Sequence, residues 1–62
     1  MAGKFVLFTD STGMFRWRLK AGTGEIIAAS RAYESKDAAE KGIASVRSQA
    51  PSAEVIDDSM KA

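Results

Sequence analysis

The stretch FRWRLKA at residues 15–21 alternates apolar and basic side chains without a break. A period of two is typical of a β-strand with one buried face and one solvated face. The apolar side chains of the expected inner face are Phe15, Trp17 and Leu19. The basic side chains of the expected outer face are Arg16, Arg18 and Lys20. The alternation therefore predicts a sheet with a defined inside and outside, but it names no activity.

Turn-forming residues lie on both sides of this strand, which we expect at Met14–Lys20. The link DSTG at 10–13 follows an apolar run at Lys4–Thr9, and the link GTG at 22–24 precedes the run Glu25–Ser30. Short links that contain glycine join antiparallel neighbours. The first thirty residues therefore predict a three-stranded antiparallel meander.

The apolar period changes to three and four after Ser35. The residues of this narrow stripe are Ala39, Gly42, Ile43, Val46 and Ala50. Ser35 is a favourable N-cap, and Pro51 ends the pattern because the residue before a proline avoids the helical region. The spacing predicts a helix of about 14 residues that packs closely on the sheet. We expect no strong i,i+4 ion pair along it.

A weaker final strand is expected at Ala53–Asp57, where Val55 and Ile56 are strongly apolar. The predicted fold class is α+β, with a β-β-β-α-β unit in which one helix covers one face of an antiparallel sheet. A single domain is expected over residues 1–62. Its ordered core would span 4–57, and the tail 58–62 would be frayed.

The composition narrows the chemistry that this chain can perform. Its 62 residues include no cysteine and no histidine, which excludes disulfides, thiol chemistry and a structural zinc site, and we expect no cofactor. Apolar burial alone must offset an ordering cost of about 1.5 kcal/mol per residue. We expect one copy of the chain to bury too little apolar surface for this. The start lacks the apolar run of a secretory signal, and no apolar stretch is long enough to span a bilayer. A cytoplasmic protein without membrane contact is the natural interpretation.

A series of ordered residues and motifs resembles the YegP-like family of small bacterial and archaeal proteins. The matching positions are Phe5, Gly13, FRWRLKA at 15–21, GEII at 24–27, Tyr33, Ser35-Lys36, KGIASVR at 41–47 and Pro51. Thr23 and Gln49 depart from the pattern, since asparagine is expected at both positions. Because Thr23 suits a positive φ poorly, the second hairpin is expected to be wider than a two-residue turn. The family has no established biochemical activity.

The resemblance implies an architecture of paired units, held either in tandem in one chain or as two chains. Two units would share one continuous antiparallel sheet, with exchanged C-terminal strands and both helices on one face. This chain holds one unit, so the implied assembly is a homodimer. A weak last strand after a proline suits exchange between protomers, and its pairing would remove an exposed sheet edge.

The row Arg16, Arg18 and Lys20 is the first candidate site. Charges on alternate strand residues stand about 7 Å apart and could track the phosphates of a nucleic acid. The competing interpretation is a solvated outer face, which we favour because the net charge is only +1. Trp17 alternates with the arginines and should face the core, whereas single-stranded binders need aromatic rings on the basic side.

The start of the predicted helix is the second candidate site. Arg31, Ser35 and Lys36 could hold a phosphate or carboxylate beside free backbone N–H groups. A capping serine followed by a solvated lysine explains the same residues, and we favour that interpretation. Tyr33 is expected to be a half-buried ring at the sheet edge.

No set of side chains in the sequence suggests catalysis or metal binding. The acids Glu54, Asp57 and Asp58 have no histidine or second cluster to complete an acid–base pair or a metal site. We therefore expect a non-catalytic homodimeric binding or accessory protein, whose partner is a second copy of itself. A weak nucleic-acid-binding module is the alternative, and an enzyme is the least favoured class.

Overall fold

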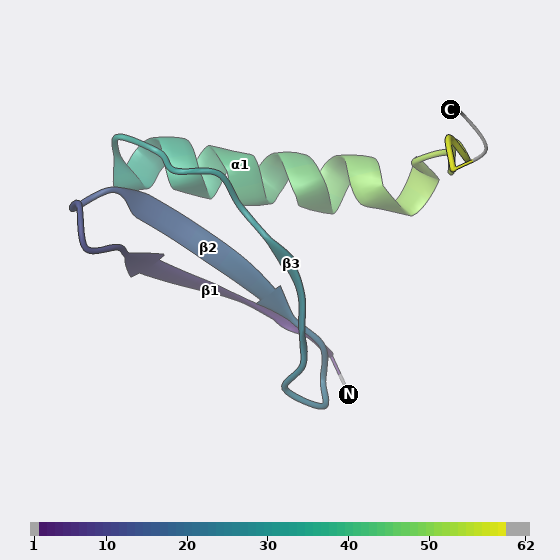
Figure 1. Cartoon of the computed structure of the whole chain (residues 1–62), viewed down its shortest axis with the longest axis horizontal. Coiled ribbons are helices and arrows are strands. Elements are labelled where there is room, and N and C mark those ends of the chain that lie inside the picture. The colour runs from purple at the N-terminus through teal and green to yellow at the C-terminus, as the bar shows by residue number, and fades with distance from the viewer. Residues whose placement is uncertain (1, 60–62) are drawn as a thin grey trace.

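Three antiparallel strands and one helix make up the fold in a computed structural model that describes residues 2–59. The elements are β1 Lys4–Thr9, β2 Phe15–Lys20, β3 Ile26–Ala29, α1 Lys36–Gln49 and a short 3₁₀ turn η1 at Ala50–Ser52. The sheet order is β1-β2-β3, and α1 lies across one face of the sheet (Figure 1). The α+β class, the meander and the helix are confirmed, while β2 and β3 are slightly shorter than expected.

Both hairpins close with the same kind of turn. The N–H of Gly13 donates to the carbonyl of Asp10 at 3.0 Å, and that of Gly24 donates to the carbonyl of Ala21 at 2.9 Å. Gly13 and Gly24 have φ values of +83° and +95°. This is a type I turn followed by a left-handed glycine, so Thr23 needs no positive φ. The expectation of a wider second hairpin is confirmed.

The core forms where β2 meets α1. Trp17 is 5% exposed, and Ala39 on the helix is fully buried. The ring of Phe5 meets Trp17 edge-on, with 5.4 Å between centroids. A Cβ on Gly42 would overlap the hydroxyl of Tyr33 and lie 3.3 Å from Nε1 of Trp17. The small residues of the helix stripe therefore let the helix approach the sheet closely, as their spacing predicts.

The helix begins and ends where the sequence predicts. Ser35 is the N-cap, and its Oγ accepts a hydrogen bond from the N–H of Ala38 at 3.1 Å. One i,i+4 ion pair does form, since Lys41 Nζ lies 3.5 Å from Asp37 Oδ2, but it is weak, in keeping with the expectation of no strong pair. Both side chains are about four-fifths exposed, so this pair stabilises the helix by only about 0.3–0.5 kcal/mol.

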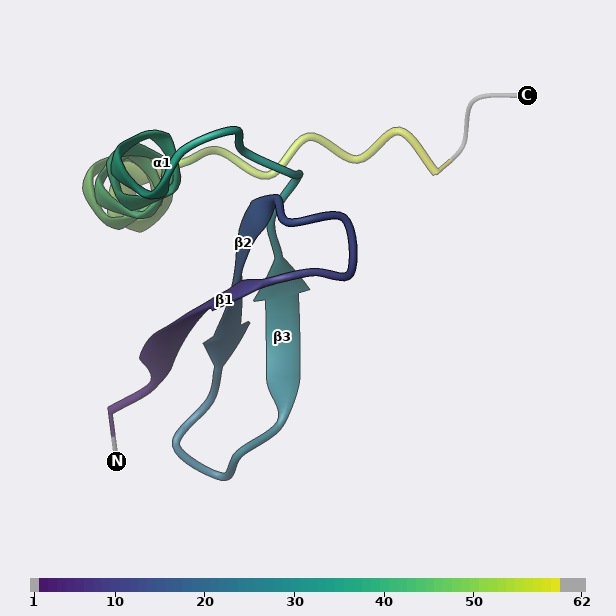
Figure 2. The same ribbon diagram turned by 90° about the vertical axis from the view of Figure 1, so that its left-hand side faces the viewer.

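The predicted final strand is absent from the single chain. Within residues 2–59, the segment 53–58 has no assigned secondary structure and runs away from the end of α1 (Figure 2). Val55 is 91% exposed and Ile56 is 67% exposed. The correction has a simple reason: a strand needs a neighbour to satisfy its N–H and C=O groups, and none of the three strands described in residues 2–59 pairs with this segment. The predicted frayed tail falls partly on residues 60–62, outside the described residues.

No helix among residues 2–59 has the length and apolar character to cross a membrane. The helix α1 has 14 residues, with charged side chains along its outer face. A bilayer span needs about 20 mainly apolar residues.

Candidate functional site

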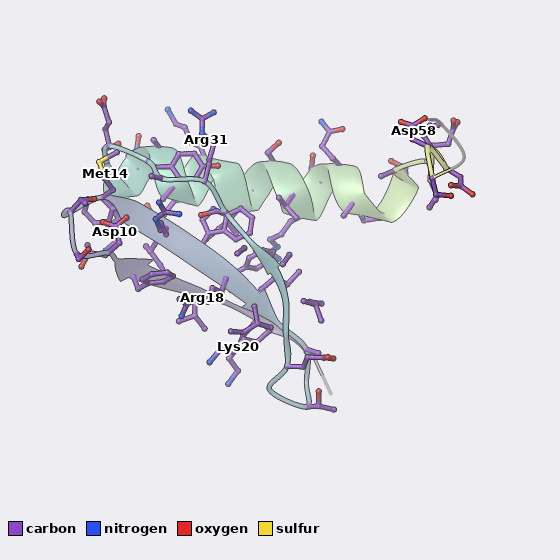
Figure 3. The ribbon with its side chains drawn as sticks, in the orientation of Figure 1. Asp10, Met14, Arg18, Lys20, Arg31 and Asp58 are labelled. Atoms are coloured by element: carbon purple, nitrogen blue, oxygen red, sulfur yellow. The ribbon has the colours of Figure 1, made fainter. Side chains whose placement is uncertain are left out.

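The strand register divides the sheet into two faces of different chemistry. Residues directly opposite one another on paired strands share a face. The pairs on the face away from the helix are Lys4 with Lys20, Val6 with Arg18, and Phe8 with Arg16. We call these six residues the open face. Figure 3 shows Arg18 and Lys20 extending from the sheet on the side opposite α1.

An aromatic ring lies on the basic side, which the sequence analysis missed. Trp17 faces the core as predicted, but Phe8 is half-buried on the open face. The guanidinium of Arg18 lies over the Phe8 ring, with 4.4 Å from Cζ to the ring centroid. The length of the turn decides this placement, because a three-residue loop at 11–13 pairs Phe8 with Arg16. The objection that no aromatic accompanies the basic row is therefore removed.

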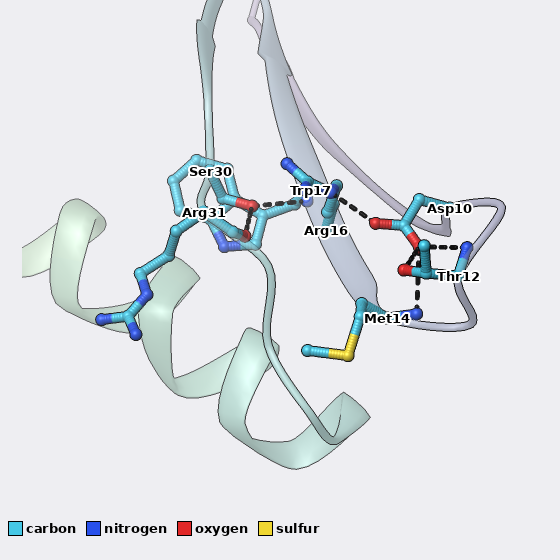
Figure 4. A network of polar contacts seen from close by, with 7 residues as sticks. All are labelled: Asp10, Thr12, Met14, Arg16, Trp17, Ser30 and Arg31. Carbon is cyan, nitrogen blue, oxygen red and sulfur yellow. Dashed lines mark hydrogen bonds and ion pairs between the residues drawn. The ribbon is translucent and has the colours of Figure 1, made fainter.

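Arg16 is compensated by an acid from the first hairpin. Its Nε donates to Asp10 Oδ2 at 2.6 Å, and the other carboxylate oxygen accepts from the N–H groups of Thr12 and Met14 (Figure 4). Hydrogen bonds from the Thr12 side chain and from Arg16 hold the pKa of Asp10 well below its usual range. This ion pair ties Arg16 to the hairpin turn.

The remaining cations of the open face are uncompensated. Among residues 2–59, none of Lys4, Arg18 and Lys20 forms an ion pair with a carboxylate. Lys4 and Lys20 stand directly opposite one another on adjacent strands. Like charges in this position destabilise strand pairing. The predicted row thus splits into a neutralised Arg16 and a positive cluster of three, one of which, Lys4, the sequence analysis did not include.

The second candidate site is not assembled as an anion pocket. The hydroxyl of Ser35 is engaged in capping the helix, and Lys36 is exposed at its first residue. The guanidinium of Arg31 lies over the ring of Tyr33, 5.8 Å from its centroid. Tyr33 is half-buried and bridges to β2, which confirms its predicted place at the sheet edge. The structure therefore supports the capping interpretation.

Ser30 has a structural role beside that helix start. Its Oγ accepts from the N–H of Trp17 at 2.9 Å and donates to the carbonyl of Arg31 at 2.7 Å (Figure 4). The hydroxyl thus continues the pairing of β2 and β3 past the end of the ladder. Among residues 2–59, no group of three acidic side chains lies close enough together to hold a metal ion.

Comparisons with known proteins give a consistent family. The sequence model described as "Domain of unknown function (DUF1508)" matches residues 10–57. A UPF0339 protein of Treponema denticola is 54% identical over 57 residues, which cover 92% of this chain and 98% of that protein. The UPF0339 protein YegP of Escherichia coli is 57% identical over 54 residues. The match covers 87% of this chain but 49% of YegP, so the chain spans about half the length of that relative.

A solved structure shares the fold. The solution structure of a protein from Haloferax volcanii superposes with a TM-score of 0.83 at 40% identity, covering 90% of this chain and 95% of the other. The profile match, the identities and this superposition confirm the resemblance inferred from the motifs. The chain belongs to the YegP-like UPF0339 family, whose domain of unknown function is DUF1508.

Proposed function

We propose that this chain is a non-catalytic binding or accessory protein of the cytoplasm that works as a homodimer. In the proposed dimer, each subunit gives its C-terminal segment 53–57 to the partner's sheet. Both helices then lie on one side, and the open faces of the two subunits lie on the other. The open face is the binding surface.

The observation that carries the proposal is the exposure of the apolar side chains in the C-terminal segment 53–57. This segment is extended, it follows Pro51, and its side chains Val55 and Ile56 are 91% and 67% exposed. Fully burying such a side chain stabilises a protein by about 1.5–3 kcal/mol. The outer strand β3 presents a free edge, with Ile26 and Ile27 more than half exposed. An apolar strand without a neighbour and a sheet edge without a neighbour favour pairing between chains.

The surface of the single chain is also larger than its mass warrants. Its accessible area is 5071 Å², whereas a compact monomer of 6.6 kDa exposes roughly 3,900 Å². The Cα radius of gyration is 13.6 Å, against roughly 10–11 Å for a compact chain of this length. The excess area is similar to what one partner buries in a large stable interface.

The lengths of the relatives support the same assembly. The match covers 98% of the Treponema denticola protein but 49% of YegP. A relative of twice the length has room for two such units in one chain. A single-length relative would need a second copy to form the same arrangement.

The non-catalytic part of the proposal rests on the available side chains. The sequence has no histidine or cysteine to act as a base or nucleophile near neutral pH. The described polar groups of the first hairpin and of the helix start hold turns and caps together. The open face, by contrast, carries charged side chains without carboxylate partners among residues 2–59, which suits binding.

Light scattering on the eluting peak of a sizing column tests the assembly. We expect twice the 6.6 kDa mass of one chain at low-micromolar concentration. Val55→Asp and Ile56→Asp are compared separately, because neighbours on a strand point to opposite faces and one of them must enter the core. The matched control is Ser11→Asp, which adds the same charge at an exposed hairpin position.

At least one tail variant should lower the mass towards that of a single chain, while Ser11→Asp leaves it unchanged. Hydrogen exchange adds a second readout, since the amides of 53–57 should be protected in the dimer and unprotected after dissociation. A well-folded wild-type chain with the mass of one copy would refute the dimer. Protection that is absent from 53–57 in a stable dimer would refute the exchange.

A further inference from the structure

We infer that the open face binds single-stranded nucleic acid. The phosphates would be held by Lys4, Arg18 and Lys20, and one base would stack on the pair formed by Phe8 and Arg18. The inference rests on the proposed role as a binding protein, but each open face lies within one chain and does not need the dimer. Single-stranded nucleic acid is the proposed ligand class, and a dimer would offer two surfaces for it.

The charge of the open face is the first support. It carries four basic side chains, and the neighbouring Asp10 compensates Arg16 alone. Lys4, Arg18 and Lys20 are left without a carboxylate partner among residues 2–59. The whole chain has a net charge of only +1, so the positive charge is concentrated on this surface. A polyanion complements it.

The opposed lysines of β1 and β2 are the second support. A carboxylate in place of Lys4 would face Lys20 across the strands as an ion pair. The chain instead places two ammonium groups opposite one another, which weakens the pairing of its own strands. A bound phosphate between them would remove that repulsion. Folding alone therefore does not favour this pair of lysines, whereas an anionic ligand would relieve their repulsion.

The stacked pair of Phe8 and Arg18 separates nucleic acids from other polyanions. A guanidinium that lies over a ring, with its Cζ 4.4 Å from the ring centroid, offers a planar cation on which a nucleobase can stack. Base stacking on aromatic rings or arginine planes is sequence-tolerant and requires unstacked bases. The bases of a duplex are already stacked on each other. The platform consequently favours a single strand.

The dimensions of the surface fit a few nucleotides. Lys20 and Arg16 lie four residues apart on β2, which corresponds to roughly 13 Å along the strand. Lys4 lies across from one end of this span, and Phe8 lies across from the other. Phosphate contacts would thus concentrate at the lysine end, and base stacking would lie towards the first hairpin.

Fluorescence anisotropy with labelled oligonucleotides tests the inference. The probes are a single-stranded RNA, a single-stranded DNA, a duplex of the same sequence and inorganic polyphosphate, all at low salt. We expect both single strands to bind more tightly than the duplex and the polyphosphate. The logarithm of the affinity should fall with the logarithm of salt by about 0.7 per phosphate contact, or roughly 2 in total.

The charge variant Lys4→Glu is matched by Lys36→Glu on the helix, which makes the same change in net charge. We expect Lys4→Glu to weaken single-strand binding at least about fivefold and to lower the salt slope by about 0.7. It should also raise the urea midpoint, because it replaces a repulsive pair by an attractive one. Lys36→Glu should leave both affinity and salt slope nearly unchanged.

The ring variant Phe8→Leu keeps an apolar side chain and removes the stacking surface. We expect roughly a fivefold or greater loss of affinity for single strands and little change for polyphosphate. Arg18→Gln, which keeps most of the side-chain length, should weaken both. The single tryptophan is buried on the other face, so an unchanged Trp17 emission spectrum reports that each variant is folded.

Four results would overturn the inference: no binding at low salt, equal affinity for duplex and single strand, equal loss in Lys4→Glu and Lys36→Glu, or undiminished binding by folded Phe8→Leu. The mass of each sample, measured by light scattering, separates this inference from the proposed dimer. Binding by a single-chain species would refute the dimer and leave the ligand class standing. A dimer that binds none of the oligonucleotides would refute the ligand class and leave the dimer standing.

Discussion

The two faces of the three-stranded sheet differ in chemistry: one is apolar and covered by the helix, and the other is basic and exposed. The inner face carries Trp17 and is sealed by small helix residues, of which Ala39 is fully buried. The open face carries Arg18, which is solvent-exposed and rests on an aromatic ring. The inner face has no charge to satisfy, and the open face has charges without partners. One side of strand β2 therefore contributes to the core, whereas the other side carries the charges of the proposed binding surface.

The largest effect should follow from emptying the inner face. Trp17→Ala is expected to lower the free energy of unfolding by about 3–5 kcal/mol, because it leaves a cavity under α1. Arg18→Ala, one position along on the other face, should cost no more than about 1 kcal/mol. Urea unfolding followed by circular dichroism measures both, since Trp17→Ala removes the only tryptophan. Similar losses of unfolding free energy in the two variants would contradict the view that the inner face alone stabilises the fold.

A smaller effect should come from the helix surface that covers the inner face. Gly42→Ala is expected to destabilise the protein by about 1–3 kcal/mol, because its Cβ would overlap Tyr33. The exposed position Ala44 should show the opposite preference, with Ala44→Gly costing about 1 kcal/mol. Thermal unfolding at one protein concentration compares them. A stabilising Gly42→Ala would mean that the helix does not sit this close to the sheet.

On the open face, a substitution should increase stability. Lys4→Glu is expected to raise the free energy of unfolding by about 0.2–1 kcal/mol, since it places a carboxylate opposite Lys20. The gain should shrink at high salt, where surface charges are screened. Urea titrations at low and high salt measure it. A loss of stability at low salt would show that the two lysines do not repel one another across the strands.

The smallest effect should appear at the acid that neutralises Arg16. The folded-state pKa of Asp10 is depressed, so the unfolded chain binds more protons in the acid range. The stability that this carboxylate contributes is therefore fully present above its unfolded pKa of about 4 and is lost as the pH falls below it. Asp10→Asn keeps an oxygen acceptor but removes the charge. It should be less stable than the wild type at pH 6, and the difference should shrink towards pH 3 in urea titrations.

Local patterns in the sequence predict most of the secondary structure. The alternation at 15–21 predicts which face of β2 is buried, and Trp17 lies there. The capping serine and the proline predict the limits of α1. These features depend on neighbours within a few residues, for which steric preference and hydrogen bonding are set by residue type.

The candidate site depends on contacts that a local pattern does not specify. Phe8 stacks under Arg18 and Asp10 neutralises Arg16 only once β1 and β2 pair in one register. The expected final strand does not form in the single chain for the same reason, because 53–57 pairs with no strand among residues 2–59.

The sequence by itself therefore determined the three strands of the meander, the helix, the buried face and the family of this protein. Only the tertiary structure decided which cations keep their charge unpaired, which aromatic ring lies among them, and that the C-terminal segment is left without a partner strand. The physical reason is the sequence distance over which each interaction acts. Residue type determines the local backbone conformation, whereas charge compensation and strand pairing depend on groups that folding brings together from distant parts of the chain.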